Sequence, residues 1–157
     1  MPAKEILLYG NKLLKRTSKR IDRIDEKVIK LSRDLKDTLK GANGIGLSAP
    51  QIGELSRIIL INLKDGTKPI LLINPKILSK SGKEEKREGC LSYPGYEGIV
   101  SRPKRVTVSG INLKGNKVEY NTDGLLARAF CHEIDHLNGI LYMEKSKKLY
   151  KLDSKND

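Results

Sequence analysis

The clearest periodic pattern of hydrophobic residues lies in the first third of the chain. Its members recur every three or four residues, as on one face of an α-helix, and are Val28, Leu31, Leu35 and Leu39. A glycine follows at position 41, the kind of residue at which helices commonly end. The pattern therefore predicts a helix from Ile24-Asp25 to Lys40.

Short apolar runs after this helix predict β-strands. The runs are 57–62, 68–74, 93–100 and 105–113. Asp65-Gly66 separates the first two, which predicts a hairpin, and Gly115-Asn116 predicts a further turn. The glycine-rich stretch 44–51 is expected to be a loop. The stretch 76–88 is dominated by charged residues and is assigned no element.

A second helix is predicted near the C-terminus. Asp123 is a plausible N-cap, and Asn138-Gly139 is a plausible end. The order of one helix, several strands and another helix indicates an α+β fold. Without an internal repeat or a linker, residues 1–157 are expected to form one domain, in which residues from about 144 to 157 make a charged C-terminal tail.

The second predicted helix carries the only two histidines of the chain. His132 and His136 lie four residues apart and flank Glu133 in the run His-Glu-Ile-Asp-His. Residues four apart share a face of a helix, so both imidazoles can reach one ion. An HExxH run is typical of a site in which a metal activates water and the glutamate moves its proton. The pattern predicts a catalytic metal site.

Two histidines need a third protein ligand to hold a catalytic ion. One class of metalloproteases takes its third ligand from a histidine six residues after the second one, but Tyr142 occupies that position here. Another class uses a glutamate some twenty or more residues downstream, but Glu144 is the only later glutamate of this chain. The third ligand is therefore expected upstream. On a helix, Cys131 would point about 100° away from its neighbour His132. Cys90 therefore remains as the candidate ligand. The alternative for either cysteine is a small buried hydrophobic residue.

Three short runs together resemble the signature motifs of the polypeptide deformylase family. They are the glycine-rich stretch 44–51 (GIGLSAPQ), the stretch 88–92 (EGCLS) and the stretch 132–136 (HEIDH). The resemblance extends from about Tyr9 to Tyr142. The family motif usually has alanine where this chain has Ser48, so we expect a local adjustment of hydrogen bonds and retained activity.

The resemblance implies a fold in which small antiparallel sheets pack around the HExxH helix. It also implies a metal-dependent hydrolase that removes the formyl group from the N-terminal formylmethionine of new polypeptides, with metal-bound water as nucleophile. Cys90, His132 and His136 would hold Fe²⁺, for which Zn²⁺, Ni²⁺ or Co²⁺ could substitute. Glu133 would act as general base and acid, and the Gln51 side chain and the Leu91 N–H would stabilise the oxyanion.

The side chain of the substrate's methionine needs an apolar pocket beside the metal. Leu125, Arg128 and Ala129 precede His132 by one or two helical turns, so Ala129 and the aliphatic part of Arg128 can reach the same face. Ile45 and Gly46 would come from the glycine-rich stretch. These five residues are the expected substrate-binding set. Alternatively, the apolar ones belong to the core.

Composition favours a compact intracellular protein. No stretch approaches the length of a membrane span, and no secretory signal is present at the start. With one of the two cysteines assigned to metal, no pair remains for a disulfide, so the cytoplasm is the expected location. The net charge of +12 makes the basic clusters at 76–87 and 145–155 candidate contacts to ribosomal RNA, or a passive charged surface.

Two other functions fit parts of the sequence. A metalloprotease that cuts internal peptide bonds would explain the HExxH run, but its downstream ligand is missing. A closed structural zinc site formed by both cysteines and both histidines would suit a basic RNA-binding module. The second alternative requires the adjacent residues Cys131 and His132 to bind one ion, and it leaves Gln51 and Glu133 without a role.

Overall fold

The computed structural model describes residues 3–152. Its helices are α1 (Glu26–Lys40), α2 (Gly124–Leu137) and the single-turn α3 (Tyr142–Lys145), with 3₁₀ helices η1 (Lys12–Lys15) and η2 (Ala49–Ile52). Its strands are β1 (Gly46–Ser48), β2 (Ile58–Ile61), β3 (Ile70–Ser81), β4 (Glu84–Cys90), β5 (Tyr93–Arg102), β6 (Arg105–Ile111), β7 (Lys117–Asp123) and β8 (Ser146–Lys151).

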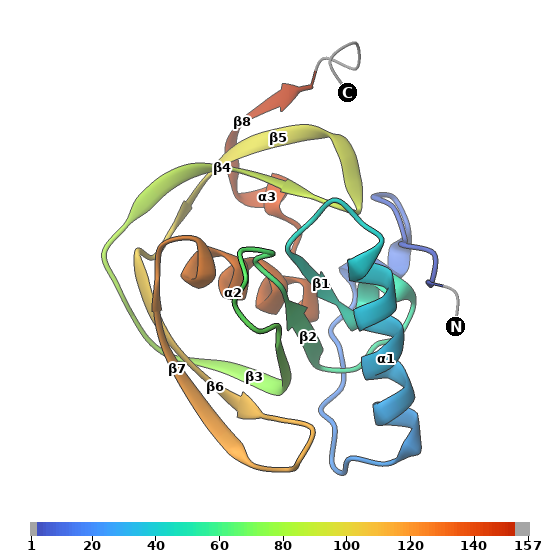
Figure 1. The fold of residues 1–157 in the computed structure, drawn as a ribbon. Helices are drawn as coiled ribbons and strands as arrows, with labels where there is room; N and C mark the ends of the chain where they lie inside the picture. Colours follow the sequence, from blue (N-terminus) through green and yellow to red (C-terminus); the bar gives the residue numbers. More distant parts are fainter. Residues whose placement is uncertain (1–2, 153–157) are drawn as a thin grey trace.

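The strands form two antiparallel sheets around helix α2 (Figure 1). The larger sheet has the strand order β1-β2-β3-β6-β7, and the smaller sheet has the order β4-β5-β8. Helix α2 lies in the middle of the molecule and packs against β1, β2, β3, β6 and β7. The predicted α+β fold, with small antiparallel sheets around the C-terminal helix and one N-terminal helix, is confirmed.

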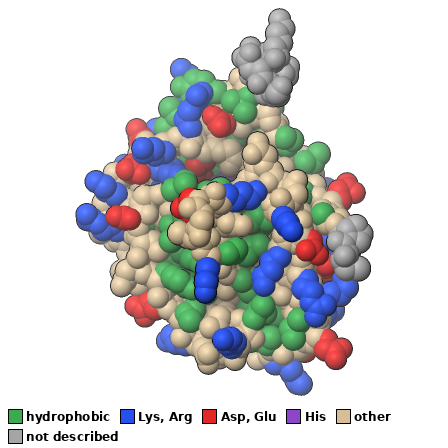
Figure 2. Space-filling view, viewed as in Figure 1, with side chains coloured by type: hydrophobic (Ala, Val, Ile, Leu, Met, Phe, Trp, Pro, Cys, Tyr) green, Lys and Arg blue, Asp and Glu red, His purple; other side chains and the backbone are tan. Residues whose placement is uncertain are grey.

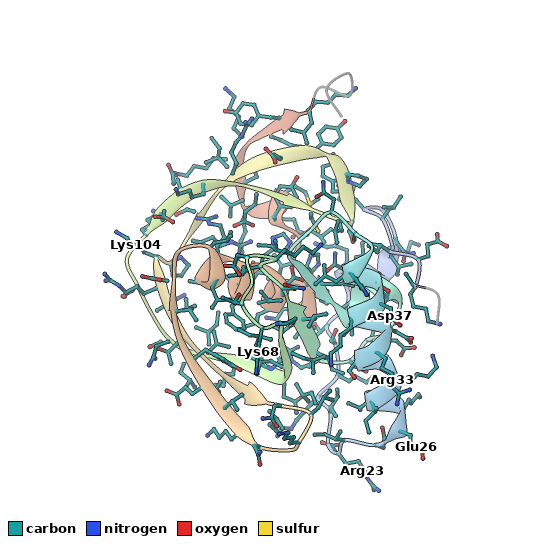
Figure 3. The ribbon with its side chains drawn as sticks, in the orientation of Figure 1. Arg23, Glu26, Arg33, Asp37, Lys68 and Lys104 are labelled. Atoms are coloured by element: carbon teal, nitrogen blue, oxygen red, sulfur yellow. The ribbon has the colours of Figure 1, made fainter. Side chains whose placement is uncertain are left out.

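Helix α1 begins two residues after the predicted start and ends at the predicted residue. The Asp25 side chain caps it by accepting a hydrogen bond from the Val28 N–H at 3.0 Å. Its apolar face packs with β2 in a core that includes Leu35, which is fully buried. Glu26 and Arg33 lie on the exposed side (Figure 3). The period of 3.6 residues therefore describes this helix correctly.

Helix α2 starts directly after Asp123, as predicted, and ends at Leu137. It is buried over most of its length because apolar residues occupy more than one face. Ala127, Phe130 and Leu137 are fully buried in the core formed with the larger sheet. The helix that carries the two histidines is thus held rigidly at the centre of the fold.

Each of the four predicted strand runs overlaps one strand, in order β2, β3, β5 and β6, although three runs extend one or two residues beyond the strand. The fully buried strand β2 pairs with β3 through Ile58↔Ile73 and the next three residue pairs, which confirms the predicted hairpin. Gly66 adopts a positive φ of 95° in the connecting loop, a conformation that favours glycine.

Several regions that were not predicted as strands pair with neighbouring strands, among them β7 on β6 and β8 on β5. The glycine-rich stretch forms β1 and η2 instead of a loop, because Gly46–Ser48 pair with β2. The charged stretch 76–88 forms the end of β3 and most of β4. Charged side chains are compatible with these strands because their solvent-facing sides stay exposed, so a one-dimensional hydrophobic pattern misses them.

The expected C-terminal tail is structured as far as residue 152. Residues 142–145 form α3, and Ser146–Lys151 form β8, which pairs with β5. Residues 153–157 of the expected tail lie outside the described residues. In the part of the chain that is described, no helix is long and apolar enough to cross a membrane.

Candidate metal centre

The HExxH helix and the end of β4 bring three ligand side chains together. His132 and His136 lie one turn apart on α2, and their ring centroids are 5.0 Å apart. The Cys90 Sγ lies 3.3 Å from the His136 Nε2. One ligand atom from each of the three residues lies within 4.8 Å of the other two. A single cation can contact all three.

An irregularity in strand pairing accompanies the position of Cys90. The β4–β5 register shifts between Glu88 and Cys90, and Cys90 then pairs with Tyr93 across a tight connection. Irregularities of this kind bend a strand and redirect a side chain, and they are common beside functional sites. Cys131, in contrast, is a buried member of the core against the larger sheet. It is not part of the three-residue ligand group.

A buried carboxylate supports the first histidine from behind. Glu88 accepts four hydrogen bonds: two from Arg102 at 2.8 and 2.9 Å, one from Arg128 at 2.5 Å and one from His132 Nδ1 at 2.9 Å. Arg102 also donates to Asp135 at 2.6 Å. This network fixes the His132 ring and leaves its Nε2 for a metal.

Electrostatics maintain the charge of this network. Burial alone would raise the pKa of Glu88, but the hydrogen bonds from Arg102 and His132 outweigh burial and hold the pKa well below its usual range. Burial likewise acts to lower the pKa of Arg102, yet its bonds to Glu88 and Asp135 raise it. Glu88 is therefore an anion and Arg102 a cation at neutral pH.

Glu133 lies beside the candidate ligands, and one of its carboxylate oxygens has no hydrogen-bond partner within residues 3–152. Its side chain is 4% exposed, and burial raises its pKa to about 7. Gly46 of β1 lies against it, so closely that a Cβ at position 46 would be 2.5 Å from Oε2. The unpartnered atom is Oε1. A buried oxygen of this kind normally has a partner, and a water molecule or substrate in the cleft would supply one.

Gln51 is buried beside Cys90 and is held at both ends of its side-chain amide. Its Oε1 accepts hydrogen bonds from the N–H and the hydroxyl of Ser48, both at 3.0 Å. Its Nε2 donates to the Cys90 Sγ at 3.5 Å and to the Ser92 hydroxyl at 3.1 Å. The local adjustment expected at Ser48 is therefore a hydrogen bond to Gln51.

A cleft of about 490 Å³ opens above these groups. All five residues of the expected substrate-binding set line it, as do Leu91 and Glu133. Leu125 is 56% exposed at the cleft, whereas Ala129 is buried. The guanidinium of Arg128 points to Glu88 and to the carbonyl oxygens of Val100 and Glu84, so its aliphatic part faces the cleft only at its edge.

Several residues around the site were not singled out from the sequence. Arg102 and Asp135 join the Glu88 network, Ser92 accepts a hydrogen bond from Gln51, and Tyr93 and Tyr96 line the cleft as a stacked pair with centroids 4.5 Å apart. Glu88 and Ser92 lie inside the EGCLS run, which is a signal that could have drawn attention to them. Arg102 has no local signal because its partners are distant in sequence.

The chemistry of the ligand atoms fits a transition metal. A thiol and two imidazoles are ligands that zinc and iron accept. Burial and the charge of His132 lower the pKa of His136 well below its usual value, which favours the neutral imidazole that a metal requires. Burial also acts to lower the pKa of His132, but hydrogen bonds to Cys90 and Glu88 outweigh it and raise that pKa. Metal binding displaces protons from ligands of this kind.

This fold and site define a class of metal-binding α+β proteins with an HExxH helix and a cysteine ligand from a neighbouring sheet. A family model described as polypeptide deformylase matches residues 3–152. The chain belongs to the polypeptide deformylase family, and it is an enzyme of that family.

Individual relatives agree with this assignment over nearly the whole chain. The chain is 47% identical to a peptide deformylase of Lachnoclostridium phytofermentans over 92% of its own length and 90% of the relative's. It is 46% identical to a peptide deformylase of Carboxydothermus hydrogenoformans, with 95% and 97% of the two chains covered. The resemblance thus extends past Tyr142, beyond the expected limit.

Solved structures show the same fold. A peptide deformylase of Synechococcus elongatus in complex with actinonin superposes with a TM-score of 0.89 at 39% identity, covering 94% of this chain and 81% of the other. A peptide deformylase of Thermotoga maritima superposes with a TM-score of 0.89 at 34% identity, covering 94% of this chain and all of the other.

Proposed function

We propose that this enzyme hydrolyses the formyl group from the N-terminal formylmethionine of newly synthesised polypeptides and releases formate. The observation that carries the proposal is the convergence of Cys90, His132 and His136 at a cleft that also contains the unpartnered carboxylate oxygen of Glu133. A formamide is a weak electrophile, so its hydrolysis needs an activated nucleophile and a proton carrier, and the site has groups for both.

Cys90, His132 and His136 are proposed to hold Fe²⁺, with Zn²⁺, Ni²⁺ or Co²⁺ as substitutes. A bound ion of this kind lowers the pKa of a water molecule toward about 7 and polarises a carbonyl oxygen. The chain prepares the ligands for the ion. Glu88 orients the His132 ring through Nδ1, and the Arg102 and Arg128 cations hold Glu88 in place.

Glu133 is proposed to move the proton. Among the described residues its buried Oε1 has no hydrogen-bond partner, so this oxygen is free to accept a proton. After taking the water proton, the same carboxyl group would deliver it to the departing amine nitrogen, which is a poor leaving group as an anion. Glycine at position 46 leaves room for this carboxylate, because a Cβ there would lie 2.5 Å from Oε2.

Gln51 and Leu91 are proposed to stabilise the oxyanion formed when the formyl carbon is attacked. The Gln51 Nε2 is directed toward Cys90, and Leu91 follows Cys90 directly and lines the cleft. Donors that are already in position cost little reorganisation during the reaction. Removing one donor of this type typically lowers the rate by about 10²–10³-fold.

The methionine side chain is proposed to lie against the apolar part of the cleft. Ile45, Leu125 and Ala129 supply apolar surface, while Gly46 and the aliphatic part of Arg128 form its edges. Leu125 is 56% exposed, so a substrate side chain that covers it would remove apolar surface from water. This contact would favour methionine over a polar first residue.

The cellular setting of the reaction is also a proposal. We place a single catalytic domain, residues 1–157, in the cytoplasm, where nascent chains leave the ribosome. Exposed lysines on β8, among them Lys148 and Lys151, would contact ribosomal RNA. Some basic side chains of this region already have acidic partners: Lys147 pairs with Glu85, and Lys145 with Asp135 at 2.9 Å.

The proposed function is tested by measuring formate release from formyl-Met-Ala-Ser by anaerobically purified protein, with bound metal quantified in the same sample. Formate release that scales with one metal ion per chain is expected. Acetyl-Met-Ala-Ser is the matched control substrate and should stay intact. Metal-loaded protein that leaves the formyl group in place, or that cuts an internal bond of a blocked peptide, would contradict the proposal.

A further inference from the structure

Ser48 and Gln51 form a closed pair of buried polar groups. Ser48 is fully buried at the end of β1, and Gln51 is 1% exposed in η2. The Gln51 Oε1 accepts two hydrogen bonds, from the Ser48 N–H and from the Ser48 hydroxyl, each at 3.0 Å. Both acceptor sites of this oxygen are therefore filled by one residue.

The two bonds have different consequences for the orientation of the amide. A backbone N–H can only donate, so it selects the oxygen end of the Gln51 amide and excludes the nitrogen end. The Nε2 consequently faces away from Ser48, toward the Ser92 hydroxyl and the Cys90 Sγ. The hydroxyl is not needed for this choice, because the backbone N–H already makes it.

We propose that Ser48 is a positioning residue for catalysis. Its hydroxyl holds and polarises the Gln51 amide, so that Nε2 becomes a stronger and better-aimed hydrogen-bond donor to the oxyanion. Hydrogen bonds in series strengthen one another, so donation to Oε1 strengthens donation from Nε2. The hydroxyl acts through Gln51 and does not contact the reacting atoms. The inference rests on the proposed deformylase function.

Local structure allows this hydrogen bond to be removed without moving the backbone. Ser48 pairs with Ile59 in the sheet and has an extended backbone with φ −113° and ψ 155°. Alanine adopts this conformation readily and keeps the N–H that orients the amide. The Ser48→Ala change therefore deletes the hydroxyl alone and leaves one buried lone pair of Gln51 without a donor.

The test compares steady-state formate release by the metal-loaded wild type and Ser48→Ala. We expect kcat to fall by about two- to tenfold, the range of one neutral hydrogen bond, with KM and metal content unchanged. Ser32→Ala is the matched control, because this buried serine hydroxyl in α1 donates to the Ile29 carbonyl oxygen at 2.7 Å, outside the site. Its kcat should equal that of the wild type.

A second pair of variants separates positioning from general structural damage. In a Gln51→Ala background, Ser48→Ala should cause no further loss of kcat, because the amide on which it acts is gone. Ser48→Cys, with a weaker donor of similar size, should give a kcat between those of serine and alanine. The melting temperature of Ser48→Cys, measured alongside, should stay near that of the wild type.

Two outcomes would overturn the inference. One is a Ser48→Ala enzyme with the kcat of the wild type. The other is an equal slowing by Ser48→Ala with and without Gln51. Wild-type protein that releases no formate would instead contradict the proposed function itself, so the two failures can be told apart.

Discussion

Glu88 shows how single residues control this site. Its carboxylate is buried, yet it accepts hydrogen bonds from two arginines and a histidine, so all of its acceptor sites are used. A buried carboxylate tolerates its burial when cationic partners of this kind neutralise it. Removing one partner leaves part of the buried charge uncompensated, which destabilises the fold. The histidine on this carboxylate is the proposed metal ligand His132, so the orientation of its ring depends on residues far from it in sequence.

At the same scale, Glu133→Gln tests the assignment of the proton carrier. The amide has nearly the same shape and leaves all three metal ligands in place, but it cannot accept the proton from water. We expect normal metal content and a decrease in kcat of about 10²–10⁴-fold, the usual contribution of a general acid–base group. Formate release and metal analysis on one sample measure both effects. Retention of wild-type turnover would refute the role.

Gly46 provides a separate test of where the Glu133 carboxylate must lie. A methyl group at position 46 would be 2.5 Å from the Glu133 Oε2, so Gly46→Ala should displace the carboxylate. We expect kcat to fall by up to about 10²-fold with metal retained, because displacements near 1 Å can cost that much. Gly41→Ala is the control, since its nearest neighbour is 4.0 Å away. Equal activities of the two variants would contradict this geometry.

At the scale of elements, the ligands join two parts of the fold. Cys90 ends β4 in the smaller sheet, whereas both histidines lie on α2, which packs against the larger sheet. A metal bound by all three links the two sheets. Metal binding to the native state alone stabilises a protein by mass action. An ion bound there would therefore also contribute to stability.

Removal of the metal by a chelator should lower the melting temperature by about 5–10 °C, for an ion present at about 100 times its dissociation constant. Cys90→Ala should lose both the metal and this response to the chelator. Cys131→Ala should keep both, because Cys131 packs in the core instead. If Cys131→Ala lost the metal and Cys90→Ala kept it, the ligand assignment would be wrong.

A helix or strand could be predicted from the sequence where its signals are local, and was missed where its burial depends on strands that are distant in sequence. Helices α1 and α2 were predicted to within two residues, because the apolar spacing of α1 and the cap residues of both helices are local signals. Strands β4 and β8 were not predicted, although they form two-thirds of the smaller sheet. Their exposed positions carry charged residues, and their pairing partners lie in β5, so no local pattern marks them.

At the scale of the whole molecule, the positive charge is spread over the face shown in Figure 2. Figure 2 shows many lysine and arginine side chains on one face, with fewer acidic ones between them. Arg33 lies on α1, and Lys104 lies at the opposite edge of the same view (Figure 3). A net charge of +12 attracts polyanions from any direction, so a specific contact must be shown by position and not by charge alone.

The proposed contact of β8 with ribosomal RNA predicts a measurable dependence on salt. Neutralising two exposed lysines with Lys148→Gln and Lys151→Gln should weaken ribosome binding and reduce the slope of log affinity against log salt by about 2, near 1 per phosphate contact. The control pair, Lys27→Gln and Lys36→Gln on α1, changes net charge equally. An equal effect of both pairs on affinity and slope would indicate nonspecific attraction.

Sequence alone determined the parts of this protein whose physics is local. The four-residue spacing of His132 and His136 defines a shared helix face, the apolar period defines α1, and the cap residues mark the ends of α2. The resemblance of three short motifs added the family and the expected ligand set. These features depend on neighbours within about one helical turn, or on short runs of residues.

Only the tertiary structure decided how distant residues meet. Arg102 of β5 and Glu88 of β4 pair behind His132 of α2, and the Gln51 Nε2 reaches Cys90 and Ser92. These contacts depend on strand register and on the packing of α2 between sheets, which local spacing does not contain. Buried polar groups need hydrogen-bond partners, and the fold decides which residues can supply them. The hydrogen-bond network around the candidate metal ligands could therefore be identified only from the tertiary structure.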